Sequence, residues 1–136
     1  MTGSAEMMSE NYCPFCDPEP GLLWFENRIA RVIRDAFPIS RGHTLVVPKV
    51  HIPSLFDLQP ESQAALWSLV GEVRQRLTEE VHPDGFNVGL NDGQSAGQTV
   101  MHAHIHVIPR SDGDVPDPRG GVRWIIPKKA RYWGEE

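Results

Sequence analysis

The sequence predicts an α+β fold in which one long helix packs on an antiparallel sheet of about five short strands. Short runs in which apolar and polar residues alternate recur along the chain, as expected for half-buried strands. Only residues 60–80 carry apolar side chains at helical spacing. The connections are short or of medium length, which favours antiparallel pairing. No internal repeat or long linker divides the 136 residues, so a single domain is expected.

Three strands are expected before the helix. Residues 22–26 and 29–35 flank Asn27-Arg28, and this arrangement predicts a hairpin. A third strand is expected at residues 43–47, where Pro48 ends it, and the chain continues extended past His51.

The helix is expected from Pro60 to Glu80. Pro60 suits the first helical position, and the carboxylate of Glu61 complements the helix dipole there. Pro83 ends the segment. Its apolar face, which should cover the sheet, consists of Leu66, Leu69, Val70, Val73 and Leu77.

Three further strands are expected after the helix, at residues 85–91, 102–108 and 122–126. Pro109 and Arg110 should close the second of these strands. Residues 111–121 are rich in Asp, Pro and Gly, so they predict a mobile surface loop.

The run at residues 102–108 carries the strongest functional signal. Half of the six histidines lie within five residues, at His102, His104 and His106. Because side chains alternate along a strand, these rings should share one face while the apolar residues between them face a core. The preceding loop, residues 91–99, is small, polar and glycine-bearing, so its backbone N–H groups can approach an anion closely. The two features together indicate chemistry at phosphorus.

Composition excludes several classes of function. The net charge of −5 argues against non-specific nucleic-acid binding, which requires a basic face. No apolar run is long enough to span a bilayer, so no membrane partner is expected. Residues 1–11 lack the features of a signal peptide and are expected to form a disordered tail. The expected location is the cytoplasm.

The only two cysteines lie in the motif Cys13-Pro14-Phe15-Cys16. Such a pair in a cytosolic chain favours a metal site or a redox role over a structural disulfide. A redox motif should lead into a helix, but Pro18 follows here. A zinc site would need two more ligands from elsewhere in the chain. A third interpretation is two half-buried thiols in an N-terminal loop.

The sequence resembles the histidine triad (HIT) family over roughly residues 13–110. The matching features are Gly-Gln-Thr-Val at residues 97–100, His-x-His-x-His at 102–106 and Gly-His-Thr-Leu-Val-Val-Pro-Lys at 42–49. The Gly-Gln-Thr spelling is similar to the fragile-histidine-triad branch, and the Cys-x-x-Cys start is similar to zinc-carrying bacterial members. The Trp-Pro-Pro-Gly ending of the Hint branch is absent. The resemblance implies a HIT-like domain over residues 12–136 and a homodimer whose two sheets join.

The resemblance also implies a reaction. Family members are hydrolases or transferases that cleave a dinucleoside polyphosphate or similar nucleotidyl compound at the α-phosphate. They release a nucleoside monophosphate through a covalent nucleotidyl-histidine intermediate. His104 matches the nucleophile, and His106 matches the residue that contacts the phosphate and assists the leaving group. No organic cofactor is implied, and the substrate can arrive as a complex with a divalent metal.

Binding residues are implied by the same comparison. Asp35 matches the ribose contact, and His43 matches a further histidine near the site. The phosphate would meet His106 and the loop residues Asn91, Gly97, Gln98, Thr99 and Val100. In zinc-carrying relatives two cysteines join two histidines, which correspond here to Cys13, Cys16, His51 and His102. Such a Cys₂His₂ set is suited to a structural zinc.

Alternatives remain open from the sequence. Three histidines on a strand can hold a catalytic metal, and a non-catalytic nucleotide-binding module would keep the same pocket. A nucleoside phosphoramidate or nucleotidyl sulfate could be cleaved through the same His104. The second half of the substrate would be recognised by residues 111–121 and the C-terminal tail. Arg110, Arg119 and Arg123 are available for further phosphates.

Overall fold

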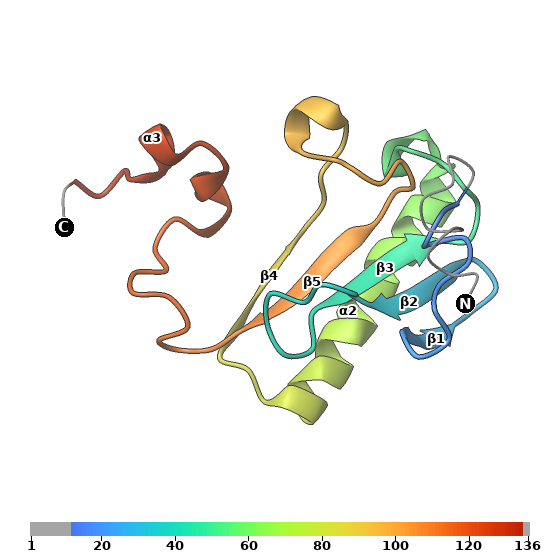
Figure 1. The fold of residues 1–136 in the computed structure, drawn as a ribbon, viewed down its shortest axis with the longest axis horizontal. Coiled ribbons are helices and arrows are strands. Elements are labelled where there is room, and N and C mark those ends of the chain that lie inside the picture. The colour runs from blue at the N-terminus through green and yellow to red at the C-terminus, as the bar shows by residue number, and fades with distance from the viewer. Residues whose placement is uncertain (1–11, 135–136) are drawn as a thin grey trace.

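A five-stranded antiparallel sheet with one long helix forms the body of the protein (Figure 1). The computed structural model describes residues 12–134, so the expected tail at residues 1–11 lies outside the described residues. The sheet order is β1-β2-β3-β5-β4. The expected fold class is therefore confirmed. The strands are β1 (Leu23–Glu26), β2 (Ala30–Arg34), β3 (Thr44–Pro48), β4 (Gly85–Gly89) and β5 (Ile105–Arg110).

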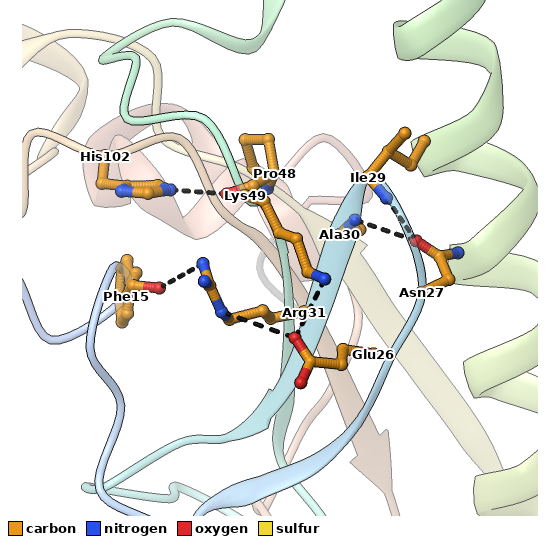
Figure 2. Close-up of polar contacts among 9 residues, drawn as sticks. All are labelled: Phe15, Glu26, Asn27, Ile29, Ala30, Arg31, Pro48, Lys49 and His102. Atoms are coloured by element: carbon orange, nitrogen blue, oxygen red, sulfur yellow. Dashed lines mark hydrogen bonds and ion pairs between the residues drawn. The ribbon is translucent and has the colours of Figure 1, made fainter.

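The hairpin between β1 and β2 is also confirmed. The side-chain oxygen of Asn27 accepts hydrogen bonds of 2.9 Å from the backbone N–H groups of Ile29 and Ala30 (Figure 2). This Asx-type turn reverses the chain directly into β2. β2 then pairs with β3, with Val32 opposite Val46.

The long helix α2 (Pro60–Val81) runs one residue beyond the expected end. The five apolar side chains predicted for its inner face are all buried. They pack on one face of the sheet, against residues that include Val32, Val46, Ile105 and Val107. A smaller cluster on the opposite face contains Phe15, Ile33, Leu45 and Val47, so the N-terminal cysteine loop covers that side.

The histidine run is less regular than a strand over residues 102–108 would be. β5 begins only at Ile105, so His102, Ala103 and His104 precede it. The alternation still holds, because Ala103, Ile105 and Val107 enter the core beneath the helix. The strand does not close before Pro109 but includes it and Arg110. β3 pairs with β5 only as far as Val107, so Pro109 has β4 as its sole neighbouring strand. A proline is tolerated there because one of its sides carries no ladder.

The prediction of a strand at residues 122–126 is wrong. A 3₁₀ helix, η3 (Gly121–Ile125), and a short helix, α3 (Pro127–Ala130), occupy this region. Gly120 and Gly121 have φ angles of 95° and 47°, which turn the chain before a strand can form. Figure 1 shows this segment (orange-red) outside the sheet, and none of the five strands pairs with it. The expected loop at residues 111–121 is largely exposed.

Two short helical turns were not predicted, η1 (Leu55–Asp57) and η2 (Gln94–Ala96). The first follows the segment that carries His51, and the second lies inside the glycine-bearing loop. Among residues 12–134, no helix combines the length and apolar character needed to cross a membrane.

Candidate active site and metal cluster

His104 is buried beside β5, and the hydrogen bond of its Nδ1 defines its tautomer. Nδ1 lies 2.7 Å from the carbonyl oxygen of His102. A carbonyl can only accept, so Nδ1 carries the proton and donates it. In a neutral ring the lone pair is therefore on Nε2, the nitrogen needed for attack on an electrophile.

A second pair of histidines defines the tautomer of His106. The backbone N–H of Ile39 donates to Nδ1 of His43 over 3.2 Å, so the proton of the neutral His43 ring is on Nε2. That nitrogen lies 2.9 Å from Nδ1 of His106 and 3.3 Å from Oδ2 of Asp35. His106 accepts at Nδ1 and keeps a proton on Nε2. His104 and His106 therefore have opposite tautomers, with their ring centroids 5.2 Å apart.

Burial keeps the rings of His43 and His106 neutral. Removal from water, reinforced by the neighbouring His104 and His43, lowers the pKa of His106 to about 4. Burial also lowers the pKa of His43, although the carboxylate of Asp35 opposes that shift. At pH 7 both rings are uncharged, so the position of each proton, rather than a full charge, determines what each ring offers.

A cavity of about 660 Å³ adjoins His104. Phe15, Leu22, Ile33 and Leu45 form its apolar wall. Polar groups in the lining include those of Asp35, Thr99 and His51. An apolar slot with a carboxylate on its rim and an imidazole in its wall suits a flat, hydroxyl-bearing ligand such as a nucleoside.

The glycine-bearing loop owes its shape to Gln98. This side chain is buried, and its oxygen accepts from the N–H of Gly93 over 2.8 Å. Its amide nitrogen donates to the carbonyls of Pro53 (2.9 Å) and Val100 (3.1 Å), and its backbone N–H is bonded to Gly93. The side-chain oxygen and nitrogen of Gln98 and its backbone N–H thus all have hydrogen-bond partners within the protein.

Among the other predicted phosphate residues of this loop, Asn91, Gly97 and Thr99 are exposed and Val100 is half-buried. Gly97 has a φ of 98°, a conformation that favours glycine. The side chain of Asn91 lies next to it, since a β-carbon at Gly97 would come within 4.0 Å of the amide nitrogen. Thr99 and Val100 continue into the cavity that His104 lines.

The predicted metal ligands converge elsewhere, beside the triad. Nδ1 of His102 lies 3.3 Å from Sγ of Cys13, 3.5 Å from Sγ of Cys16 and 3.1 Å from Nδ1 of His51. Sγ of Cys16 is also 3.3 Å from Nδ1 of His51. All four ligand atoms lie within 4.8 Å of one another. Ligands of a tetrahedral zinc are separated by about 3.3 to 3.8 Å, so the set fits this metal.

The remaining nitrogen of His102 supports the same assignment. Nε2 is 2.7 Å from the carbonyl oxygen of Pro48, to which it must donate. The lone pair of the neutral ring therefore lies on Nδ1 and faces the cysteines. A hydrogen bond from the outer nitrogen to a carbonyl is the usual support for a metal-bound histidine.

A redox role for the cysteines is disfavoured. Both thiols are free, and burial, with a hydrogen bond to Cys13, raises the pKa of Cys16. Reactive thiols have a lowered pKa instead. The three triad histidines do not converge on a single metal either, because His102 directs Nδ1 at the cysteines and Nε2 at the carbonyl of Pro48.

The arginines considered for further phosphates are engaged elsewhere. Arg110 pairs with Asp114 over 2.6 Å, and Arg119 pairs with Asp117 over 3.0 Å. Arg123 donates to backbone carbonyls of the C-terminal segment. None of the three lines the cavity beside His104.

The fold and site define an α+β protein with a buried histidine row next to a Cys₂His₂ cluster. The HIT domain model matches residues 19–113, so the chain belongs to the HIT family. An uncharacterized HIT-like protein of Mycoplasma pneumoniae is 38% identical over 109 residues, which cover 77% of this chain and 76% of that protein. A zinc-bound histidine triad protein from Mycobacterium smegmatis superposes with a TM-score of 0.69 at 36% identity, covering 82% and 86% of the two chains.

Relatives with a named activity are nucleotide hydrolases. Adenylylsulfatase HINT3 of Arabidopsis thaliana is 37% identical over 109 residues, covering 77% of this chain and 55% of its own length. The asymmetrical bis(5′-nucleosyl)-tetraphosphatase of Schizosaccharomyces pombe is 34% identical over 97 residues, covering 71% and 53%. The chain thus spans about half the length of these two relatives.

Proposed function

We propose that the protein cleaves nucleotidyl compounds at the α-phosphate, with His104 as nucleophile, and releases a nucleoside monophosphate. The observation that carries this proposal is the pair of opposite tautomers. His104 offers a lone pair at Nε2 and His106 offers a proton at Nε2, on rings 5.2 Å apart. The named activities of the Arabidopsis and fission yeast relatives support the same class of substrate.

The reaction needs two displacements. Nε2 of His104 attacks the α-phosphorus, a new N–P bond forms, and the bond to the leaving group breaks. The ring becomes positively charged, and its Nδ1–H stays bonded to the carbonyl of His102, which stabilises that charge. His106 donates from Nε2 to an oxygen of the phosphate or of the leaving group. Water then attacks the phosphorus and loses a proton to solvent, the N–P bond breaks, and His104 returns to its neutral form.

The cavity would hold the nucleoside part of the substrate. Its base would pack against Phe15 and Leu22, and Asp35 would accept hydrogen bonds from the ribose hydroxyls. Asp35 is fixed for this role, because Oδ1 already accepts from the N–H of Phe37 over 2.8 Å and Oδ2 faces His43. The α-phosphate would meet the exposed side of the loop at Asn91, Gly97, Thr99 and Val100, with Gln98 shaping that loop.

We also propose that Cys13, Cys16, His51 and His102 hold a structural zinc. When bound, the metal would tie the N-terminal loop to the chain after β3 and to the start of β5. All four positions would be filled by protein atoms, so the site is closed and the metal would not itself contact the substrate.

Two alternatives to this function remain, a related reaction and a non-catalytic role. A nucleoside phosphoramidate or an adenylyl sulfate would be cleaved through the same Nε2, and only the leaving group would differ. A non-catalytic nucleotide-binding module would keep the cavity but release no product.

The test is release of AMP from diadenosine tetraphosphate, adenosine 5′-phosphoramidate and adenylyl sulfate by the protein and by His104→Ala. His82→Asn is a matched control, because His82 is an exposed histidine outside the site with a φ of 55°, which asparagine tolerates. We expect release by the parent and the control but not by His104→Ala. Equal release by all three would refute His104 as the nucleophile. AMP binding without any release would favour the binding module.

A further inference from the structure

Phe15 lies between the two cysteines, and its ring contacts the rings of His104 and His102. It is 9% exposed and belongs to the core cluster opposite the long helix. Its ring meets the ring of His104 at a centroid distance of 4.8 Å and an interplanar angle of 61°. It also meets the ring of His102, at 5.9 Å and 86°. Both are edge contacts of the kind that aromatic rings prefer.

His102 provides a second connection between the cluster and the nucleophile. Its ring faces the cysteines, and its own carbonyl oxygen accepts the proton of His104 Nδ1 over 2.7 Å. The motif Cys13-Pro14-Phe15-Cys16 therefore touches His104 in two ways. One runs through the ring of Phe15, and the other runs through the backbone of His102.

Charged side chains also hold the cysteine loop, residues 13–16, in place (Figure 2). Arg31 donates to the carbonyl of Phe15 over 3.4 Å, and its Nε lies 3.8 Å from Oε1 of Glu26. The same carboxylate oxygen is 3.1 Å from Nζ of Lys49. Lys49 follows Pro48, whose carbonyl accepts the hydrogen bond from Nε2 of His102. This network joins the cysteine loop to the segment that precedes His51, so two ligand-bearing segments are linked even outside the cluster.

We propose that Phe15 is a positioning residue that couples metal loading of the Cys₂His₂ cluster to the orientation of the nucleophile His104. The proposal rests on the proposed role of His104 and assigns Phe15 a function beyond lining the cavity. With metal bound, the cysteine loop is fixed, and Phe15 holds the His104 ring against the carbonyl of His102. Without metal, the ring retains the hydrogen bond, but the cysteine loop is held only by the Arg31 network and core packing, so Phe15 restrains the plane of the ring less tightly.

The physical argument concerns the freedom of the imidazole. The χ2 torsion of a histidine has a broad energy well, so one hydrogen bond to Nδ1 does not fix the ring plane. The direction of the Nε2 lone pair follows that plane. A misplacement of about 1 Å can cost about a hundredfold in rate, which sets the scale of the expected effect.

The test compares Phe15→Leu, which keeps an apolar side chain but loses the ring, with Phe15→Tyr, which keeps the ring. Val47→Ala is the packing control, because Val47 is buried in the same core cluster as Phe15 but does not line the cavity. Each protein is loaded with zinc. We then measure its zinc content, its kcat and KM for AMP release, and the exchange of the His104 Nδ1 proton with water by ¹⁵N NMR.

We expect Phe15→Leu to bind zinc normally, to lose about tenfold to a hundredfold in kcat with little change in KM, and to exchange the Nδ1 proton faster. Phe15→Tyr and Val47→Ala should keep the kcat and the proton exchange of the parent, although Val47→Ala should be less stable. Removing zinc from the parent should reproduce the faster exchange. A higher KM with unchanged kcat in Phe15→Leu would overturn the proposal, because Phe15 would then only contact the base. Unchanged proton exchange on removal of zinc, or failure of the parent to bind zinc, would also overturn it. The NMR measurement needs no substrate, so it distinguishes this failure from absence of nucleotidyl transfer.

Discussion

His43 determines which nitrogen of His106 carries a proton, and removing it should expose that role. Its Nε2 lies 2.9 Å from Nδ1 of His106, and only 4% of His43 is exposed. His43→Ala leaves this acceptor unpaired, so the proton of His106 can move to Nδ1 and the donor facing the phosphate is lost. Loss of one such donor costs about a hundredfold to a thousandfold in kcat. The cavity and the unpaired nitrogen should also lower the free energy of unfolding by about 2 to 4 kcal/mol.

His43→Gln tests the hydrogen bond directly, because a glutamine amide nitrogen can donate to Nδ1 of His106. We expect it to recover at least about tenfold of the lost kcat. Thr44→Val is the matched control: Thr44 is the next residue, fully buried, and donates to the carbonyl of Gly42 over 2.7 Å. It should lose stability but keep kcat. The assay is kcat for AMP release at pH 7, with urea unfolding alongside. A folded His43→Ala protein whose kcat stays within about twofold of the parent would refute the tautomer argument.

Three further predictions follow from the cluster, from burial and from one turn. Removing metal from the Cys₂His₂ cluster should lower the free energy of unfolding by about 3 kcal/mol or more, measured by thermal melting with and without chelator; an unchanged melt would contradict a structural zinc. In the metal-free protein, stability should be full above pH 6.5 and fall as the pH drops towards 4. Burial lowers the pKa of His106 to about 4, so the unfolded chain takes up the proton first. The free energy of unfolding should fall by about 1 to 3 kcal/mol over this pH range, measured by urea titration. His106→Asn should make its pH dependence flatter; an equally steep dependence in this variant would refute His106 as the cause. Gly42→Ala should cost about 1 to 3 kcal/mol in urea unfolding, because Gly42 has a φ of 89° and a β-carbon would lie 3.0 Å from Val81; unchanged stability would contradict that packing.

The sequence predicted the body of the fold because its patterns were local. The apolar stripe of the long helix and the alternation around the histidines both report which side of an element is buried. The alternation was predictive even though His102 and His104 precede the strand, since extended chain alternates its side chains with or without ladder bonds.

The C-terminal segment shows where local patterns fail. Residues 122–126 are mostly apolar, and that composition predicted a strand, but a strand also needs a neighbour to pair with. Two glycines with positive φ and Pro127 turn the chain into helical turns instead. Apolar composition alone does not show whether a sheet edge is within reach.

The site was predicted as a set of residues but not as a set of tautomers. The four predicted metal ligands lie close together as the family resemblance implied, although they come from segments far apart in the chain. The tautomer of His43 depends on a backbone N–H from Ile39, which no sequence pattern indicates. The contact between Phe15 and His104 was missed for a similar reason, because a single residue between two cysteines looks like a spacer until the loop is seen folded against β5.

The central claim is that His104 forms a covalent bond to the nucleotide. The most direct measurement is rapid acid-free quenching of the parent during turnover of adenosine 5′-phosphoramidate or diadenosine tetraphosphate, followed by peptide mass spectrometry. We expect the peptide that contains His104 to gain the mass of one adenylyl group, and His104→Ala to gain none. Steady turnover with no adduct on any histidine, together with inversion of configuration at a chiral α-phosphorus, would show a single displacement and contradict the account.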